Sequence, residues 1–213
     1  MNPNNRDLAP LEIPYFQQTR TATCGPACLM MVMKYWDPSF EFSRRMEFYL
    51  WKKSFSFFLF GGTYQFGLAV AAKKQGFQPM IYQKGRFSDG YPNHPSLVNL
   101  VESIVSRKVR RLQVPIVYGS ENNQIINDAL RKSIPPIVFI NLLPLLGENV
   151  FHWVVVTGVD EQNVFVNDPY VPKGSVVKEK KNSQIPLDRF SLAMATQTGK
   201  MLRLPPCVLL IKP

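Results

Sequence analysis

The stretch that decides the fold of this chain reads Gln17-Gln18-Thr19-Arg20-Thr21-Ala22-Thr23-Cys24-Gly25-Pro26-Ala27-Cys28. The residues that follow, as far as Trp36, are apolar on almost every side, which predicts a buried helix over 24–36. Pro26 suits the first turn of this helix, where a missing N–H costs nothing, and Thr23 is expected to cap it. Cys24 would then lie at the positive end of the helix dipole, which favours the nucleophilic thiolate.

The two cysteines of this stretch have two interpretations. Both can be small hydrophobic side chains one helical turn apart, as free cysteines often are. Alternatively, one of them is a nucleophile. In papain-type cysteine peptidases, a glutamine amide and the backbone N–H of the nucleophile bind the developing oxyanion together. Gln18 lies six residues before Cys24 and ten before Cys28, so this interpretation selects Cys24 and leaves Cys28 a structural role.

A second stretch, Phe151-His152-Trp153-Val-Val-Val-Thr-Gly158, is followed after a polar turn by Val-Phe-Val-Asn-Asp at 164–168. Two runs of β-branched and aromatic residues around a turn predict a hairpin. With a loop at 159–161, His152 faces Asp168 directly; with a loop at 159–163, Asp168 is diagonal to His152 on the same face. Asn167 points to the other face in both cases. A carboxylate beside an imidazole fixes its tautomer and supports the imidazolium during proton transfer.

These stretches resemble the C39-type cysteine peptidases, through the blocks Gln18…Cys24-Gly-Pro-Ala-Cys, His152-Trp-Val-Val-Val-Thr-Gly and Asn-Asp168-Pro. Residues 61–77 are similar to a free-standing C39-like family, and the resemblance covers residues 13–211. It implies a papain-like fold with Cys24 as nucleophile, His152 as base, Asp168 as orienting acid and Gln18 as oxyanion donor. Relatives attached to transporters cleave leader peptides after a double glycine. They usually carry aspartate where this chain has Thr23, so their substrate preference does not transfer directly.

The remaining patterns predict an α+β fold, in which N-terminal helices, one of them central and buried, pack on a mainly antiparallel sheet. Further helices are expected within 40–60 and at 68–74, 97–111, 123–132 and 187–195, and strands at 77–83, 114–118, 137–141 and 207–212. Polar loops are expected at 84–96, which would hold His94 at the surface, and at 171–185. We expect a lead-in at 1–12 and a single C39-like domain at 13–213.

Composition narrows the class of protein. The 213 residues are 46% hydrophobic and 19% charged, which is typical of a globular chain with an ordinary core. Three cysteines, without an N-terminal hydrophobic region, favour a reducing cytoplasm over a disulfide framework. No apolar run approaches the roughly 18 residues of a membrane-spanning helix. No P-loop is present either, so the transporter machinery of the better-known relatives is not encoded in these residues.

The net charge is +10, and basic residues gather at 107–111 and 178–181. These clusters are either a solvated helix face and a polar loop, or sites that attract acidic peptides or polyanions. Neither an RNA-binding aromatic motif nor a helix-turn-helix pattern accompanies the charge, so a nucleic-acid partner is not indicated.

Three classes of function fit these residues. The leading one is a cysteine-dependent peptidase or other amide hydrolase acting on a peptide or protein; transpeptidation and isopeptide cleavage would use the same residues. The second is a peptide-binding module that keeps the fold without turnover. The third is a metal site formed by Cys24, Cys28, His152 and Asp168, which would leave Gln18 without a role. The leading interpretation needs no cofactor and no metal.

Overall fold

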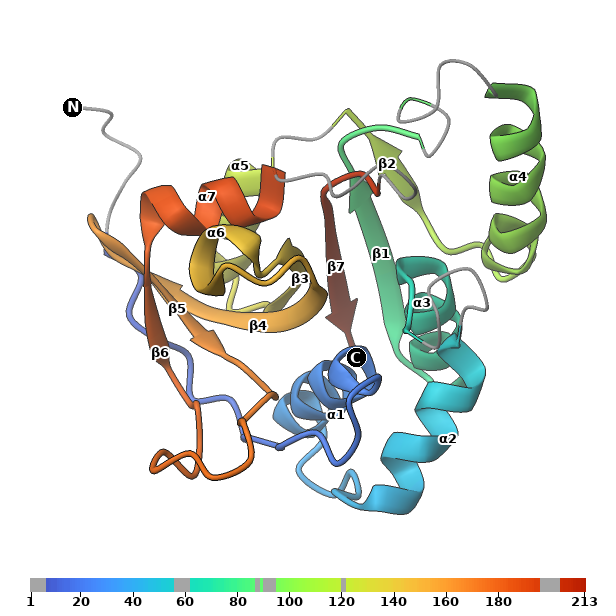
Figure 1. The fold of residues 1–213 in the computed structure, drawn as a ribbon. Helices are drawn as coiled ribbons and strands as arrows, with labels where there is room; N and C mark the ends of the chain where they lie inside the picture. Colours follow the sequence, from blue (N-terminus) through green and yellow to red (C-terminus); the bar gives the residue numbers. More distant parts are fainter. Residues whose placement is uncertain (1–6, 56–61, 87–88, 90–94, 120–121, 196–203) are drawn as a thin grey trace.

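A seven-stranded sheet runs through the centre of the described part of the chain, in the order β2-β1-β7-β3-β4-β5-β6 (Figure 1). The computed structural model describes residues 7–55, 62–86, 89, 95–119, 122–195 and 204–213. Only β1 and β2 run parallel; the other neighbouring strands are antiparallel. The strands are β1 (Gln78–Gln83), β2 (Ile116–Tyr118), β3 (Pro136–Asn141), β4 (Phe151–Val159), β5 (Asn163–Asn167), β6 (Ser183–Pro186) and β7 (Cys207–Lys212). The predicted mainly antiparallel sheet is therefore confirmed.

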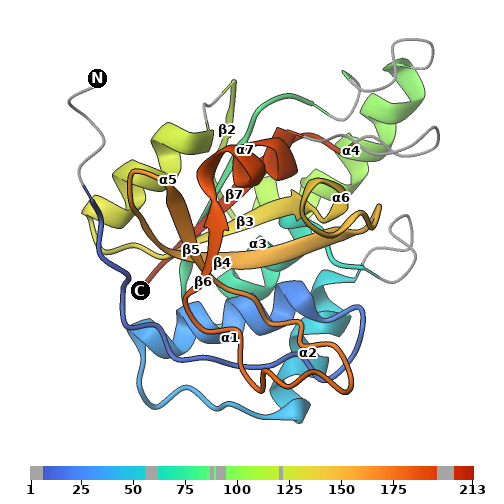
Figure 2. The ribbon, with the colours of Figure 1, turned by 60° about the vertical axis from the view of Figure 1, so that its left-hand side comes forward.

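Helices cover both faces of this sheet, as Figure 2 shows. The N-terminal helices α1 and α2 lie on one side, with α1 against β4 and α3 against β1, while α5, α6 and α7 lie on the other side. The helices are α1 (Cys24–Trp36), α2 (Arg44–Ser54), α3 (Gln65–Lys74), α4 (Pro95–Arg111), α5 (Asn122–Arg131), α6 (Leu143–Leu146) and α7 (Leu187–Ala195). The arrangement confirms the predicted α+β class, with α1 as its central helix.

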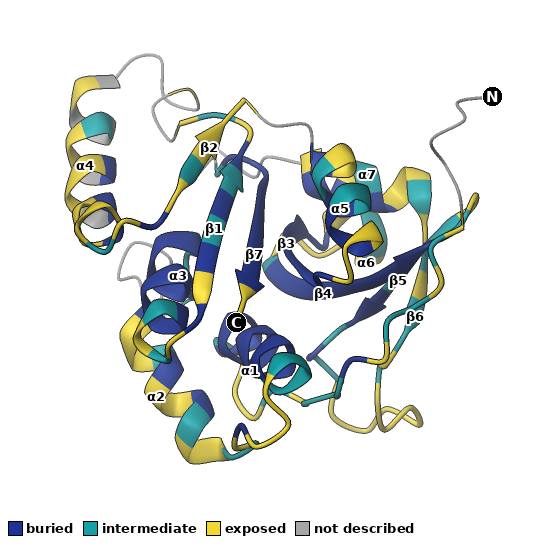
Figure 3. Cartoon of the chain, turned by 180° about the vertical axis from the view of Figure 1, so that it is seen from behind, coloured by how far each residue is buried: buried dark blue, intermediate teal, exposed yellow. Residues whose placement is uncertain are grey.

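Two hydrophobic clusters pack on the two faces of the sheet, and β4 contributes to both. Trp153 and Val155 belong to the cluster around α1, whereas Val154 and Val156 belong to the cluster around α7. Alternate side chains of a strand point to opposite faces, so covering both faces explains the nearly continuous apolar sequence of β4. Figure 3 shows most of α1, β7 and β4 in the buried class, while the outer sides of α2 and α4 are exposed.

Several elements differ from the sequence-based expectations. The strand β6 lies partly inside the predicted polar loop at 171–185, and the one-turn helix α6 lies in a segment for which no helix is predicted. The helix α3 begins three residues earlier than expected. Within the predicted lead-in, Leu8 pairs with Val159 through two backbone hydrogen bonds, at the far end of β4 from His152. The expectation for His94 concerns a residue outside the described ranges.

Candidate active site

Cys24 is the first residue of α1 and is buried, at 8% exposure. All ten residues from Cys24 to Met33 are buried, so the helix enters the core immediately at its N-terminal end. A glycine is required at position 25 because the helix passes very close to a neighbouring segment there. A Cβ on Gly25 would lie 2.3 Å from the Thr63 hydroxyl oxygen. The predicted placement of Cys24 at the start of a buried helix is therefore confirmed.

The predicted capping hydrogen bond of Thr23 to this helix was wrong. Thr23 occupies the N-cap position, but its side chain makes no capping hydrogen bond to a first-turn amide. The hydroxyl instead lies 2.8 Å from the carbonyl oxygen of Arg20 and 2.5 Å from a carboxylate oxygen of Glu47 on α2. The side chain is turned toward the preceding loop and α2, because acceptors there compete for its proton.

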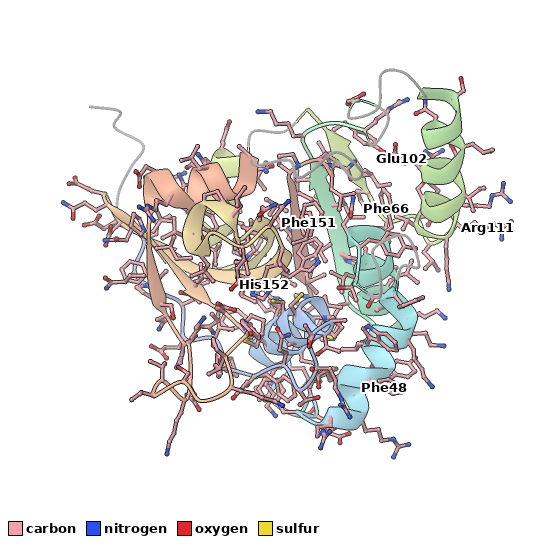
Figure 4. The ribbon with its side chains drawn as sticks, in the orientation of Figure 1. Phe48, Phe66, Glu102, Arg111, Phe151 and His152 are labelled. Carbon is pink, nitrogen blue, oxygen red and sulfur yellow. The ribbon has the colours of Figure 1, made fainter. Side chains whose placement is uncertain are left out.

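His152 lies on β4, where the strand approaches α1 (Figure 4), and is 5% exposed. Its Nε2 atom lies 2.7 Å from Oδ1 of Asp168, just beyond the end of β5. Near the site, Val155 pairs with Asn167 and Val156 with Val166, so Asp168 is diagonal to His152 on the same face. This is the second of the two predicted registers. It is reached through a bulge between Val156 and Gly158, with a shorter loop at 160–162.

The side chain of Asn167 has a different environment, as the strand alternation predicts. Its Nδ2 donates to the carbonyl oxygen of Ile13 at 3.3 Å, and its Oδ1 accepts from the backbone N–H of Asn182 at 2.9 Å. Asn167 is fully buried. It therefore holds the segments at 13 and 182 to β5, while Asp168 faces the imidazole.

Asp168 is held by several groups besides His152. Its Oδ1 accepts from the backbone N–H of Tyr170 at 2.9 Å, and its Oδ2 lies 3.2 Å from the ammonium nitrogen of Lys180. Burial opposes ionisation of Asp168, but the hydrogen bond and charge of His152, together with Lys180, lower its pKa below the ordinary value. The carboxylate is therefore charged at neutral pH, as an orienting acid has to be.

His152 also interacts with Cys24. Burial alone would lower the pKa of His152, but hydrogen bonds to Asp168 and Cys24 and the charges of both groups raise the pKa to about 10. Since Nε2 faces Asp168, Nδ1 is the ring nitrogen left for the Cys24 sulfur. The raised pKa of His152 and the lowered pKa of Asp168 favour an imidazolium beside a carboxylate.

Cys28 has the environment of a structural thiol. It is fully buried, and its Sγ atom donates to the carbonyl oxygen of Trp153 at 3.3 Å. Burial, and then the charges of Cys24 and Asp168, raise the pKa of Cys28 well above its ordinary value. Within the described ranges, no group of three or more His, Cys, Asp or Glu side chains is arranged to hold a metal ion.

Gln18 is close to the site, but its amide is engaged locally. Its backbone N–H donates to the carbonyl oxygen of Pro169, the residue after Asp168, at 2.9 Å. Its Nε2 donates to the carbonyl oxygens of Arg20 at 2.8 Å and Thr21 at 3.2 Å. Among the described residues, its buried Oε1 has no hydrogen-bond partner. Both amide hydrogens are therefore used by the loop that leads to Cys24.

Sequence reasoning did not find several residues that surround this site. Tyr15 donates from its hydroxyl to the carbonyl oxygen of Asp168 at 2.9 Å, and the ring of Tyr170 meets that of His152 edge-on with centroids 6.4 Å apart. Lys180 belonged to a basic cluster that was considered only for its overall charge. The sequence spacing of these three residues does not predict their positions, because each lies in a loop that brings it close to Asp168 or His152.

The fold is that of the C39, papain-like class of peptidase domains. The chain belongs to the Peptidase_C39 like family, which it matches over residues 13–210. This membership and the shared fold support a peptidase-type function. No curated protein matches the sequence. No helix in the described part of the chain is long and apolar enough to cross a membrane.

Two solved structures illustrate the similarity of fold. A C39-like peptidase from Bacillus anthracis is 13% identical, with a TM-score of 0.59, and the alignment covers 98% of this chain and 99% of that one. A double glycine motif protease from an AMS/PCAT transporter, solved in complex with a leader peptide, is 17% identical, with a TM-score of 0.50. In that case the alignment covers 96% of this chain and 94% of that one.

Proposed function

We propose that this chain is a cysteine peptidase in which Cys24 is the nucleophile, His152 the acid and base, and Asp168 the orienting acid. The observation that carries the proposal is the row of contacts from Cys24 to the His152 ring and from His152 Nε2 to Asp168 Oδ1 at 2.7 Å. A nucleophile, a base and a group that orients the base are the minimum set for covalent amide hydrolysis.

The chemistry has two halves. The Cys24 thiolate attacks the substrate carbonyl carbon, and the electron pair of the C=O double bond moves to oxygen. As this pair returns, the C–N bond breaks and the His152 imidazolium gives its proton to the leaving amine, leaving a thioester. The neutral His152 then takes a proton from water, which attacks the thioester, releases the acid and restores the thiolate and the imidazolium. Asp168 stays ionised throughout.

The oxyanion requires donors that point to the attacked carbonyl. The first is the backbone N–H of Cys24, because first-turn amides of a helix have no acceptor inside the helix. The second is the Gln18 amide, in which the longer, 3.2 Å hydrogen bond to Thr21 is the one that the substrate oxygen would replace. Replacing Gln18 with alanine should raise the barrier by about 2.7–4 kcal/mol, measured as a loss of kcat.

A cavity beside Asp168 supports a peptide or protein as the substrate. It has a volume of about 600 Å³, and its lining includes the apolar side chains of Ile140, Val154 and Val166 and the basic side chains of Lys180 and Arg189. Apolar walls with a few charged groups are the usual composition of a ligand site. The cavity suits an apolar side chain next to an acidic one, which agrees with the net charge of +10.

Two neighbouring valines provide a matched test of this cavity. Val177 lines the cavity and is 53% exposed, whereas Val176 is 97% exposed and does not line it. Arginine at either position adds the same charge to the same loop. Val177→Arg should raise KM for peptides with apolar side chains, and Val176→Arg should not. Equal effects of the two variants on KM would show that the cavity does not bind the substrate.

The decisive test of the function is turnover of a diverse peptide library by the purified protein. Cleavage that is lost in both Cys24→Ala and His152→Ala supports the peptidase. A protein that binds peptides at Cys24 but never cleaves them would be the binding module instead. Amine acceptors added to the same assay show whether the thioester is passed to an amine rather than to water. The free thiols of Cys24, Cys28 and Cys207 agree with action in the reducing cytoplasm, which is part of this proposal.

A further inference from the structure

Glu47, in the first turn of α2, has a buried side chain that takes no part in the proposed peptidase reaction. The residue is only 1% exposed. Burying a carboxylate is costly unless hydrogen bonds compensate for the lost water. The position of its partners therefore shows what this side chain does.

The side-chain hydrogen bonds of Glu47, within the described residues, all reach the loop between Gln18 and Cys24. Oε1 accepts from the backbone N–H of Thr19 at 2.8 Å, and Oε2 lies 2.5 Å from the Thr19 hydroxyl. Oε1 also lies 2.5 Å from the Thr23 hydroxyl. The loop therefore provides hydrogen-bond donors to both oxygens of the buried side chain.

The loop that Glu47 holds joins the two proposed oxyanion donors. Thr19 follows Gln18 directly, and Thr23 precedes Cys24 directly. Between them, the carbonyl oxygen of Arg20 accepts from Gln18 Nε2 at 2.8 Å. A single carboxylate is thus bonded at both ends of the loop, next to one donor at each end. Any change in its position moves the two donors relative to each other.

We propose that Glu47 is a positioning residue that sets the distance between the Gln18 amide and the Cys24 backbone N–H. The inference rests on the proposed function, and it adds a residue from a separate helix, outside the triad and the donor pair. Glu47 does not touch the Cys24 sulfur or His152 through any hydrogen bond described above. Its loss should therefore weaken oxyanion binding while leaving the nucleophile intact.

Two thiol reagents separate these effects. Iodoacetamide alkylates a thiolate by displacement at carbon, with no oxyanion, and reports the Cys24–His152 pair alone. A peptide aldehyde forms a hemithioacetal: the sulfur bonds to the carbonyl carbon, the carbonyl electron pair moves to oxygen, and His152 supplies the proton. Its affinity therefore depends on the oxyanion donors. The ratio of the aldehyde affinity to the iodoacetamide rate therefore reports oxyanion binding, which Glu47 is proposed to control.

The experiment compares wild type with Glu47→Ala and Thr19→Val, with Asp160→Ala as the control. Asp160 also accepts two backbone N–H groups, from Gln162 at 2.7 Å and Asn163 at 2.5 Å, but in the turn at the far end of the β4–β5 hairpin. Glu47→Ala should lower kcat and aldehyde affinity by about 100-fold, the effect of misplacing catalytic groups by about 1 Å. KM and the iodoacetamide rate should not change.

Thr19→Val removes only one hydroxyl from an exposed loop residue, so it carries the test if Glu47→Ala does not fold. It should lower kcat and aldehyde affinity by up to about tenfold, the effect of losing one hydrogen bond, at an unchanged melting temperature. Asp160→Ala should leave both unchanged. Retained kcat in folded Glu47→Ala or Thr19→Val, or an equal loss of iodoacetamide reactivity, would overturn the positioning role. Failure of wild type itself to react or turn over would instead overturn the proposed function.

Discussion

Replacing Asp168 with asparagine tests the electrostatics of the site most sharply. The two side chains have nearly the same shape, so asparagine can still offer its Oδ1 to His152 Nε2 and to the backbone N–H of Tyr170. The variant loses the negative charge that now lies 2.7 Å from the ring. It also turns an N–H₂ group toward Lys180, whose side chain is 24% exposed and can move into solvent.

The size of the effect follows from the loss of a charge-assisted hydrogen bond. Such bonds contribute about 1.5–3 kcal/mol, against about 0.5–1.5 for neutral ones, so the imidazolium loses about 1–2 kcal/mol of stabilisation. Each 1.36 kcal/mol corresponds to about one pH unit. The ionisation of His152, which the wild-type site raises to a pKa of about 10, should therefore occur roughly one pH unit lower in Asp168→Asn.

Alkylation of Cys24 by iodoacetate measures this ionisation. The reagent is an anion, so it reacts fastest while the neighbouring His152 is an imidazolium, and the rate falls as the pH rises through the pKa of His152. Mass spectrometry across the alkaline range gives the midpoint for each variant. Asn167→Asp is the comparison, because Asn167 faces Ile13 and not the imidazole. It should reduce stability by burying a charge beside a carbonyl, but it should not move the midpoint.

The reasoning fails if the midpoint is the same in wild type and Asp168→Asn, because Asp168 would then not support the imidazolium. It also fails if Asn167→Asp moves the midpoint as much as Asp168→Asn. The strand register would then be different from the one described.

Three further predictions concern the surroundings of the site. Cys28→Ala should keep peptide turnover, because its thiol is buried and protonated; a large fall in kcat at unchanged stability would contradict this. Gly25→Ala should lower the free energy of unfolding by about 1–3 kcal/mol in urea, since the new Cβ would meet Thr63 Oγ1 at 2.3 Å; a gain from alanine's helix propensity would refute the close approach. The stability difference between wild type and Asp168→Asn should depend on pH. Because the pKa of Asp168 is lowered in the folded state, its ionisation stabilises the fold above about pH 4, and this stabilisation is lost as the pH falls. Because the pKa of His152 is raised, its protonation stabilises the fold fully below about pH 6.5, and this stabilisation is lost as the pH rises toward about 10. Melting curves should therefore differ most between about pH 4 and 6.5.

Much of the site could be predicted from the sequence because its determinants are local. The start of α1 follows from an apolar run with a proline in the first turn. The choice between Asp168 and Asn167 follows from strand alternation, which a hairpin of either loop length preserves. The contact between Cys24 and His152 was not a local inference; it came from the resemblance to a known family.

The features that were missed depend on contacts between distant segments. The strand β6 has a short polar sequence and exists through its pairing with β5, which no local pattern indicates. The strand β7 was predicted at 207–212, but its insertion between β1 and β3 was not. Thr23 was expected to cap α1, but a carboxylate 24 residues further along the chain competes for its hydroxyl. In each case tertiary contacts override the local preference.

The central claim is that Cys24 is a nucleophile activated by His152, and selective alkylation tests it most directly. The chain has three cysteines, all free and buried, so a single equivalent of iodoacetamide near neutral pH makes them compete. The account predicts that tryptic mapping finds the label on Cys24, with Cys28 and Cys207 unmodified, and that His152→Ala slows the labelling strongly. Label spread over the three thiols, or the same rate on Cys24 in His152→Ala, would contradict it.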